Sequence, residues 1–204
     1  MPRVAEDRPP AQPVSAEQKD RYRRILRAAA RHGADKGLER VQMHDIARDA
    51  GVAIATLYRY FPSKMHLFTA LMDDLVDEMR RQPIERREGE SPEDSVSRLL
   101  RRAGEDLLAH PQLAHAMVQS NNATLALAAG HGVDNVFKEL LVVASGIEDP
   151  TPHDIRILLL IEQAWYGLIV AALNQWIDAE RFSADTDLMC RLLMRGRDED
   201  PARA

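Results

Sequence analysis

Residues 51–64, GVAIATLYRYFPSK, decide the fold of this chain. Two tyrosines, an arginine and a lysine lie in a short and otherwise apolar stretch, and a fully buried helix would not place Tyr-Arg-Tyr at 58–60. Leu57 and Phe61 are four residues apart, so they share one face of a helix. The pattern predicts a short helix over about 54–61 that packs on one side and contacts an anionic partner on the other.

A second apolar pattern precedes this one and predicts a helix over about 43–50. Gly51 between the two helices suits a left-handed turn residue, and Ala47 is small enough for the helices to cross closely. Together they predict a helix-turn-helix whose second helix fits the major groove of DNA. The residues expected to face DNA are Gln42, His44, Ala53, Ile54, Ala55, Thr56, Tyr58, Arg59, Tyr60 and Lys64.

The side-chain chemistry of this predicted face suggests roles for most of its members. Groups expected to bind phosphate oxygens are the hydroxyls of Thr56, Tyr58 and Tyr60 and the ammonium of Lys64. Arg59 and His44 are candidates for base edges, and Ile54 and Ala55 for thymine methyl groups. The alternative is a three-helix packing unit with incidental polar residues.

Charge is distributed unevenly along the 204 residues. Residues 1–66 hold 13 Lys and Arg against 8 Asp and Glu, a net charge of +5, and residues 67–204 hold 14 against 24, a net charge of −10. A basic first third is consistent with a polyanionic partner. The single cysteine, Cys190, excludes an intrachain disulfide and is expected to be a buried thiol. The first residues do not resemble a secretory signal, and the apolar run 157–173 is interrupted, so we expect a cytoplasmic protein with no membrane partner.

The fold class is predicted to be all-α, because apolar residues recur at helical spacing and no alternating strand pattern or internal repeat is present. Nine helices are expected, at about 15–36, 43–50, 54–61, 63–81, 91–110, 112–128, 133–145, 152–181 and 183–195. Three segments are expected: a disordered arm over 1–14, a DNA-binding domain over 15–66 that contains the helix-turn-helix, and a second helical domain over 67–204, to which the family resemblance given below assigns ligand binding and dimerisation.

Several short motifs occur at fixed spacing over residues 21–68: Ile46-Ala47, Ala50-Gly51-Val52, Thr56-Leu57-Tyr58, Tyr60-Phe61 and Lys64. With these motifs the segment resembles the DNA-binding domain of the TetR family of transcriptional regulators. The segment TLYRYFPSK at 56–64 resembles the actinobacterial repressors of cholesterol catabolism, and a weaker similarity to them extends over 109–195. Ala55 departs from the usual glycine and Gln42-Met43 from the usual threonine, so the operator is expected to differ from those of the relatives.

The resemblance implies that the last two helices pair with those of a second subunit. The long helix over 152–181 is apolar on more than one side, as expected for a helix with two partners. One wide buried stripe inside a monomer is the alternative. The residues expected at the dimer interface are Leu158, Ile161, Leu168, Ala172, Trp176, Leu188 and Leu192.

The resemblance also implies an apolar ligand pocket among the middle helices. Each candidate is individually consistent with a plain core role. The residues expected to contact the ligand are Leu75, Met79, Leu99, Ala103, Leu107, Met117, Asn121, Asn122, Leu125, Phe137, Gln163 and Trp165. The expected ligand is small and hydrophobic, such as an acyl-CoA derived from a steroid or a fatty acid.

No catalytic, metal-binding or cofactor motif is present, so we expect neither an enzyme nor a cofactor. The sequence therefore predicts a ligand-responsive repressor of the TetR type, which binds a palindromic operator as a homodimer and is released by an apolar effector. The alternatives are a nonspecific DNA-architectural protein, a lipid-binding helical protein without specific DNA binding, and a ligand-dependent activator.

Overall fold

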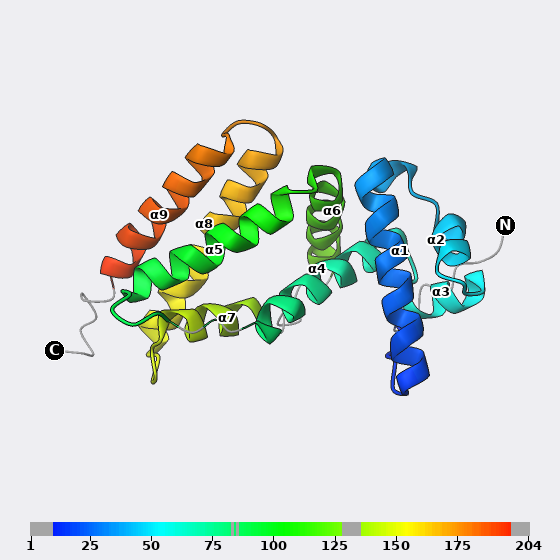
Figure 1. The fold of residues 1–204 in the computed structure, drawn as a ribbon, viewed down its shortest axis with the longest axis horizontal. Helices are drawn as coiled ribbons and strands as arrows, with labels where there is room; N and C mark the ends of the chain where they lie inside the picture. The colour runs from blue at the N-terminus through cyan, green and yellow to red at the C-terminus, as the bar shows by residue number, and fades with distance from the viewer. Residues whose placement is uncertain (1–9, 83, 85, 128–135, 197–204) are drawn as a thin grey trace. The chain divides into compact units, whose positions relative to one another are not determined.

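A computed structural model describes residues 10–82, 84, 86–127 and 136–196 (Figure 1). Over these residues the chain forms α-helices and no strand, so the all-α prediction is confirmed. The helices are α1 (Ala16–Arg40), α2 (Met43–Asp49), α3 (Ile54–Tyr60), α4 (Lys64–Arg81), α5 (Pro92–Leu108), α6 (Pro111–Leu127), α7 (Val136–Ser145), α8 (Pro152–Leu173) and α9 (Ala179–Arg195).

The contacts divide the chain into two compact units. Unit 1 comprises Met1–Leu75 and His110–Gly132, and unit 2 comprises Val76–Ala109 and Val133–Ala204. The predicted division at residue 66 is contiguous in sequence, whereas the compact units are not, because α6 packs on α1. The boundary between the units falls within α4.

Unit 1 is built around α1, which contacts both α2 and α6 (Figure 1). Ser15 and Gln18 form a capping box at its start: the Gln18 amide donates to the Ser15 hydroxyl at 3.2 Å, and the Ser15 amide donates to the Gln18 side chain at 3.4 Å. Gly37 interrupts the helical backbone with a φ of 68°, where the first helix was predicted to stop. α4 and α6 are joined by a hydrogen bond of 3.0 Å between the hydroxyls of Thr69 and Thr124.

Unit 2 packs α5, α7, α8 and α9 together. Trp165 of α8 lies in its core, where its indole N–H donates to the Leu100 carbonyl of α5 at 3.1 Å. The Phe137 ring of α7 stacks on this indole, with the ring centroids 5.4 Å apart. Ser91 and Thr151 cap α5 and α8, as their positions before proline predict.

The end of α8 and the start of α9 differ from the prediction. α8 stops at Leu173 rather than near Arg181, and Asp178 rather than Ser183 caps α9. The turn contains Gln175 at a φ of 59°, a conformation that glycine adopts more readily than glutamine. This turn contains neither glycine nor proline, so the sequence gives no local signal that the helix ends there.

An ion pair between Glu90, which precedes α5, and Arg98 of α5 makes the stability of the fold depend on pH. The Arg98 guanidinium donates to both carboxylate oxygens of Glu90, at 2.7 and 2.9 Å, and this hydrogen bonding lowers the pKa of Glu90 from 4.5 to about 2. A lowered pKa stabilises the fold above the unfolded-state pKa, and this stabilisation is lost as the pH falls through the folded-state pKa.

Glu90→Gln is accordingly expected to lower the free energy of unfolding by ~1 kcal/mol at pH 7. The difference from the parent protein should shrink between pH 4.5 and pH 2, because the parent loses the same charge there. Urea unfolding at several pH values measures this. A difference that stayed constant down to pH 2 would show that the charge of Glu90 is not what stabilises the fold.

Candidate nucleic-acid interface

α2 and α3 form the predicted helix-turn-helix, and its turn is fixed by contacts within the motif and with α1. Gly51 has a φ of 64°, the left-handed conformation expected at this position. The amide of Val52 donates to the Ala47 carbonyl at 3.0 Å, and the Arg24 guanidinium of α1 donates to the Ala50 carbonyl at 2.5 Å. Arg24 was not among the predicted functional residues, since nothing in the local sequence signals a contact 26 residues away.

One face of α3 is buried within unit 1, where Tyr60 and the following Phe61 contact Tyr22 of α1. Leu57 and Phe61 are 0% and 2% exposed, as predicted from their spacing. Tyr60 is only 2% exposed, and its ring centroid lies 5.7 Å from that of Tyr22, in an edge-to-face pair. The prediction that Tyr60 is displayed on the outside of α3 is therefore wrong, because its ring fills the aromatic cluster between α1 and α3.

The opposite face of the helix-turn-helix is open to solvent. Tyr58 is 42% exposed, and the Arg59 guanidinium lies 5.1 Å from the centroid of the Tyr60 ring, which holds it in place by a cation–π contact. Ile54 and Thr56 are half-buried. The predicted DNA-facing residues that are exposed are Gln42, His44, Ala53, Ala55, Tyr58 and Arg59.

Lys64 lies at the start of α4, and its ammonium is engaged inside unit 1. It donates to the carbonyls of Leu38 and Glu39 at 2.9 and 3.2 Å, just after the interruption of α1 at Gly37. An ammonium carries three N–H donors, so one remains beyond these two contacts. Lys64 thus closes the end of α1, and its predicted phosphate contact stays a prediction.

Acidic groups near the open face have hydrogen-bond or ion-pair partners within unit 1. The Asp49 carboxylate lies 2.7 Å from the imidazole of His32, whose hydrogen bond lowers the pKa of that carboxyl. Asp45 is paired with Lys36 and Arg48, at 3.6 and 2.8 Å. These pairs reduce the repulsion that free carboxylates on α2 would exert on a polyanion.

Comparisons with known proteins agree with this geometry. Residues 25–71 match the family model described as bacterial regulatory proteins of the tetR family, and residues 89–193 match that of the Tetracyclin repressor-like C-terminal domain. The chain belongs to the TetR family of transcriptional regulators. The two matches together cover the regions that hold the helix-turn-helix and most of unit 2.

Two named relatives refine the position of this TetR-family protein. It is 31% identical over 191 residues to the HTH-type transcriptional repressor KstR of Mycolicibacterium smegmatis, covering 92% of this chain and 93% of the relative. A similar relation holds to the KstR of Rhodococcus jostii, at 31% identity over 87% of this chain and 84% of the relative. The predicted resemblance to this group of repressors is confirmed.

Solved structures give the same fold. A TetR transcriptional regulator from Rhodococcus sp. RHA1 is 44% identical, with a TM-score of 0.79 over 88% of this chain and 97% of the other. FadR of Thermus thermophilus, a TetR-family repressor solved in complex with lauroyl-CoA, is 19% identical, with a TM-score of 0.59 over 86% of this chain and 94% of the other. The second likeness concerns the fold alone.

The predicted dimer residues fall into three groups. Leu158 and Ile161 are 0% exposed in the protomer, so they are core residues that cannot contact a partner directly, and we remove them from the interface. Leu168 and Ala172 are half-buried, and Trp176 lies beyond the end of α8 with 76% of its surface exposed. The third group is exposed on α9 and comprises Leu188 and Leu192.

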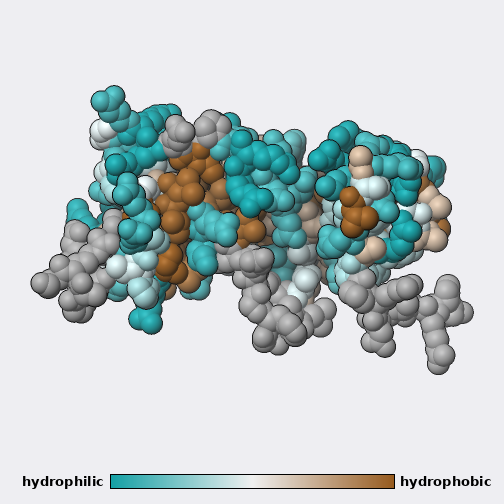
Figure 2. Space-filling view, turned by 90° about the horizontal axis from the view of Figure 1, so that it is seen from below, coloured by the Kyte–Doolittle hydropathy of each residue, from teal (hydrophilic) through white to brown (hydrophobic). Residues whose placement is uncertain are grey.

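The outer face of α8 contains residues that the sequence reasoning missed. Leu160 is 45% exposed, and Ala164 and Gly167 are exposed further along the same helix. By length and composition alone, α8 is apolar enough to cross a membrane. Only 28% of its most apolar 18-residue stretch is buried within the protein, so much of its apolar surface is left uncovered. Figure 2 shows that apolar side chains also gather on the surface over unit 2. Knowing which turns of α8 face the core would have been needed to find these positions.

The predicted ligand residues are divided between the two units. In unit 2, Leu99, Ala103, Leu107 and Trp165 are buried, Met79 and Phe137 are half-buried, and Gln163 is exposed rather than buried as expected. In unit 1, Met117 is buried, Leu75 and Asn121 are half-buried, and Asn122 is exposed. The side chain of Leu125 lies outside the described residues. Only the subset around the Phe137–Trp165 stack is brought together within one unit.

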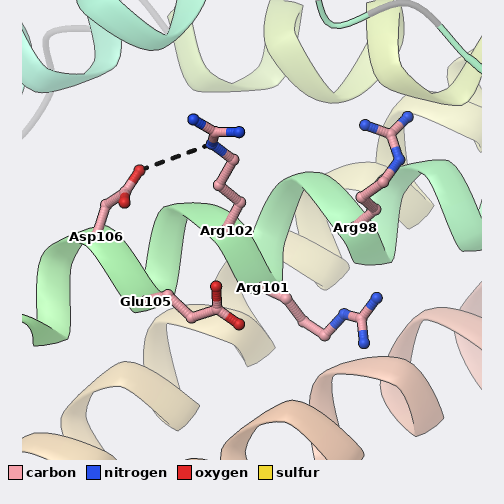
Figure 3. Close-up of a pocket in the computed structure, with 5 residues that line it drawn as sticks. All are labelled: Arg98, Arg101, Arg102, Glu105 and Asp106. Atoms are coloured by element: carbon pink, nitrogen blue, oxygen red, sulfur yellow. Dashed lines mark ion pairs between the residues drawn. The ribbon is translucent and has the colours of Figure 1, made fainter.

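A surface hollow of about 350 Å³ lies along α5 in unit 2 (Figure 3). It is lined by Arg98, Arg101, Arg102, Glu105 and Asp106. Arg102 points toward Asp106, 3.9 Å away, and Arg101 is paired with Asp187 of α9 at 3.3 Å. This charged hollow is not the apolar pocket that the sequence predicts. The apolar ligand pocket stays a prediction.

Two further sequence-based expectations concern Cys190 and the possible metal ligands. Cys190 is 0% exposed, as predicted, and burial raises the pKa of its thiol to about 12, so the thiol remains protonated at neutral pH. No group of three or more His, Cys, Asp or Glu residues suited to a metal ion occurs among the described residues. The family and the KstR relatives are transcriptional regulators rather than enzymes.

Proposed function

We propose that this TetR-family protein is a ligand-responsive repressor that binds a palindromic operator as a homodimer and releases it when an apolar effector binds. The open face of α2 and α3 carries the proposal, because it displays Tyr58 and Arg59 on a short helix of the type that enters the major groove. One helix-turn-helix contacts only a half-site, and a twofold operator matches a twofold protein. We place the protein in the cytoplasm, as is usual for repressors of this family.

The dimer is supported by the unburied apolar surface of α8 and α9. We infer an interface formed by Leu188 and Leu192 of α9 with Leu160 and the neighbouring small residues of α8. Leu168 and Ala172 remain in this proposed interface, and Trp176 lies at its α8–α9 end. Two recognition helices held about 34–36 Å apart would then enter successive major grooves.

The proposed effector is a hydrophobic acyl-CoA derived from a steroid or a fatty acid. Similarity to the KstR repressors and to a fold that accommodates lauroyl-CoA in another protein supports this class. α4 continues from unit 1 into unit 2, so we propose that it transmits the change in spacing between the recognition helices. The effector must bind the two states with different affinity for release to follow.

Selection of bound fragments from the source genome, at about 150 mM salt, tests the proposal where nonspecific binding is weak. Recovery of a shared palindrome, followed by its release on addition of lauroyl-CoA or a steroid acyl-CoA, would support a ligand-responsive regulator. Binding without a shared site would favour a nonspecific architectural protein. A protein that binds the effector but retains no DNA fragment, even without effector, would be better described as a lipid-binding protein. Tighter DNA binding in the presence of effector would favour ligand-dependent DNA binding.

Two tyrosines on α3 offer a matched test of the DNA-binding face. Tyr58→Phe is expected to weaken binding to the selected fragment about tenfold, because each subunit loses one phosphate hydrogen bond of ~0.5–1.5 kcal/mol. Tyr60→Phe should weaken binding less than Tyr58→Phe, since its ring is buried against Tyr22 and its hydroxyl acts only through Arg59, from whose guanidinium it accepts a hydrogen bond at 3.4 Å. Fluorescence anisotropy with a labelled fragment measures both. An unchanged affinity for Tyr58→Phe would mean that the hydroxyl of Tyr58 makes no specific contact with DNA.

A further inference from the structure

The chain that precedes α1 is attached to the recognition helix. We define residues 10–14 as the N-terminal strap. The backbone amide of Ala11 donates to the Arg59 carbonyl of α3 at 3.1 Å. At the other end of the strap, the amide of Val14 donates to the Gln18 side chain of α1 at 2.8 Å. The strap therefore connects the start of α1 to the last turn of α3.

The hydrogen bond from Ala11 satisfies a group that α3 cannot satisfy itself. The last four carbonyls of a helix lack intrahelical donors, and Arg59 is the penultimate residue of α3. An unstructured arm would leave this carbonyl to water. The contact instead fixes a defined stretch of extended chain against the one helix that the proposed function places in the DNA groove.

The position on α3 determines what the strap would meet. The N-terminal residues of a recognition helix enter the major groove, so its C-terminal end lies toward the sugar–phosphate backbone at the edge of the groove. Gln12 is exposed on the strap, and the neighbouring Arg59 side chain is exposed on α3. Both side chains would then lie near phosphate groups, and contacts to phosphate position a protein on DNA without reading the base sequence.

We propose that the N-terminal strap is a third DNA-contacting element, which lies against the phosphate backbone beside the C-terminal end of α3. The proposal rests on the proposed function, because it requires that α3 binds an operator. It adds to the helix-turn-helix a segment that was expected to be part of a disordered arm. The Ala11–Arg59 hydrogen bond is what holds the strap in register with the groove.

A single added charge reports whether the strap is near phosphates. Gln12→Lys introduces one cation per subunit on the strap, and Gln119→Lys introduces the same charge on the exposed surface of α6. Each new phosphate contact steepens the salt dependence by about 0.9, so a Gln12→Lys dimer should lose about tenfold more affinity than the parent between 50 and 200 mM salt. Gln119→Lys should show the parental salt dependence.

The anchor is tested in the Gln12→Lys background. Ala11→Pro removes the amide donor, whereas Ala11→Gly retains it. If the strap is held by Ala11, only Ala11→Pro should return the salt dependence of Gln12→Lys toward that of the parent. Circular dichroism should show unchanged helix content in both variants, since the capping box of α1 begins at Ser15.

The probe is the DNA fragment recovered by genomic selection, and the readout is fluorescence anisotropy over a salt series. Failure of the parent protein to bind any fragment specifically would contradict the proposed function itself. Specific binding by the parent, combined with identical salt dependence for Gln12→Lys, Gln119→Lys and the parent, would overturn the strap proposal alone. Identical behaviour of Ala11→Pro and Ala11→Gly would overturn the role of the Arg59 anchor.

Discussion

Replacing Leu188 and Leu192 together by glutamate is expected to convert the dimer into folded monomers and to reduce operator affinity by more than about a hundredfold. These leucines are 47% and 56% exposed in the protomer and stand one helical turn apart on α9. Full burial of a leucine is worth ~1.5–3 kcal/mol, so roughly half of that is available at each site, and it counts twice in a symmetric dimer. Glutamate forfeits this burial and must also lose its hydration at the interface.

The protomer itself should tolerate these changes, because both side chains already face solvent when it is alone. Analytical ultracentrifugation measures the mass, and circular dichroism checks the fold. Val143→Glu is the matched control: Val143 is 58% exposed on α7, outside the proposed interface, and its substitution should preserve the dimer. A double variant that sedimented as a dimer would exclude this surface of α9 as the interface.

The sequence was most informative where structure depends on local chemistry. Ser15, Ser91 and Thr151 cap the helices that were predicted to begin at about 15, 91 and 152, since each side chain accepts a hydrogen bond from the amide three residues ahead. Gly51 adopts the predicted left-handed turn for a similar local reason. The fold class and the helix-turn-helix followed from such signals and from the spacing of apolar residues.

Long-range contacts account for what the sequence did not predict. Tyr60 was expected to be exposed because a fully buried helix would not contain the run Tyr58-Arg59-Tyr60, but a ring from α1 provides it with a buried partner. Lys64 was assigned to phosphate alone, although the break at Gly37 leaves two carbonyls within its reach. No local pattern indicates either contact, because each joins residues that are distant in the sequence.

The interface on α8 shows a related limitation. The sequence identified a helix that is apolar on more than one side, but it could not assign each apolar residue to the core or to the partner. Leu158 and Ile161 face the core, whereas Leu160 between them faces outward. A helix turns by about 100° per residue, so adjacent leucines differ in role once the packed side is fixed.

Phe182→Ala is expected to lower the free energy of unfolding by ~3–5 kcal/mol, because it removes a large ring from a packed core. Phe182 of α9 is 2% exposed, and its ring lies directly over Gly104 of α5. Gly104→Ala should also destabilise, since the added methyl would overlap that ring. The cost of overpacking, ~1–3 kcal/mol, exceeds the ~1 kcal/mol that alanine contributes over glycine inside a helix.

The two substitutions should therefore couple. In the Phe182→Ala background the overlap is gone and the methyl of Gly104→Ala partly fills the cavity, so the same change should become stabilising. Urea unfolding of the single and double variants measures this reversal of sign. Gly167→Ala, introduced into the monomeric Leu188→Glu/Leu192→Glu protein, is the control, because nothing lies within 4 Å of the added methyl and it should stabilise by ~1 kcal/mol. If Gly104→Ala destabilised equally with and without the Phe182 ring, close packing of α5 against α9 would not explain why glycine occupies position 104.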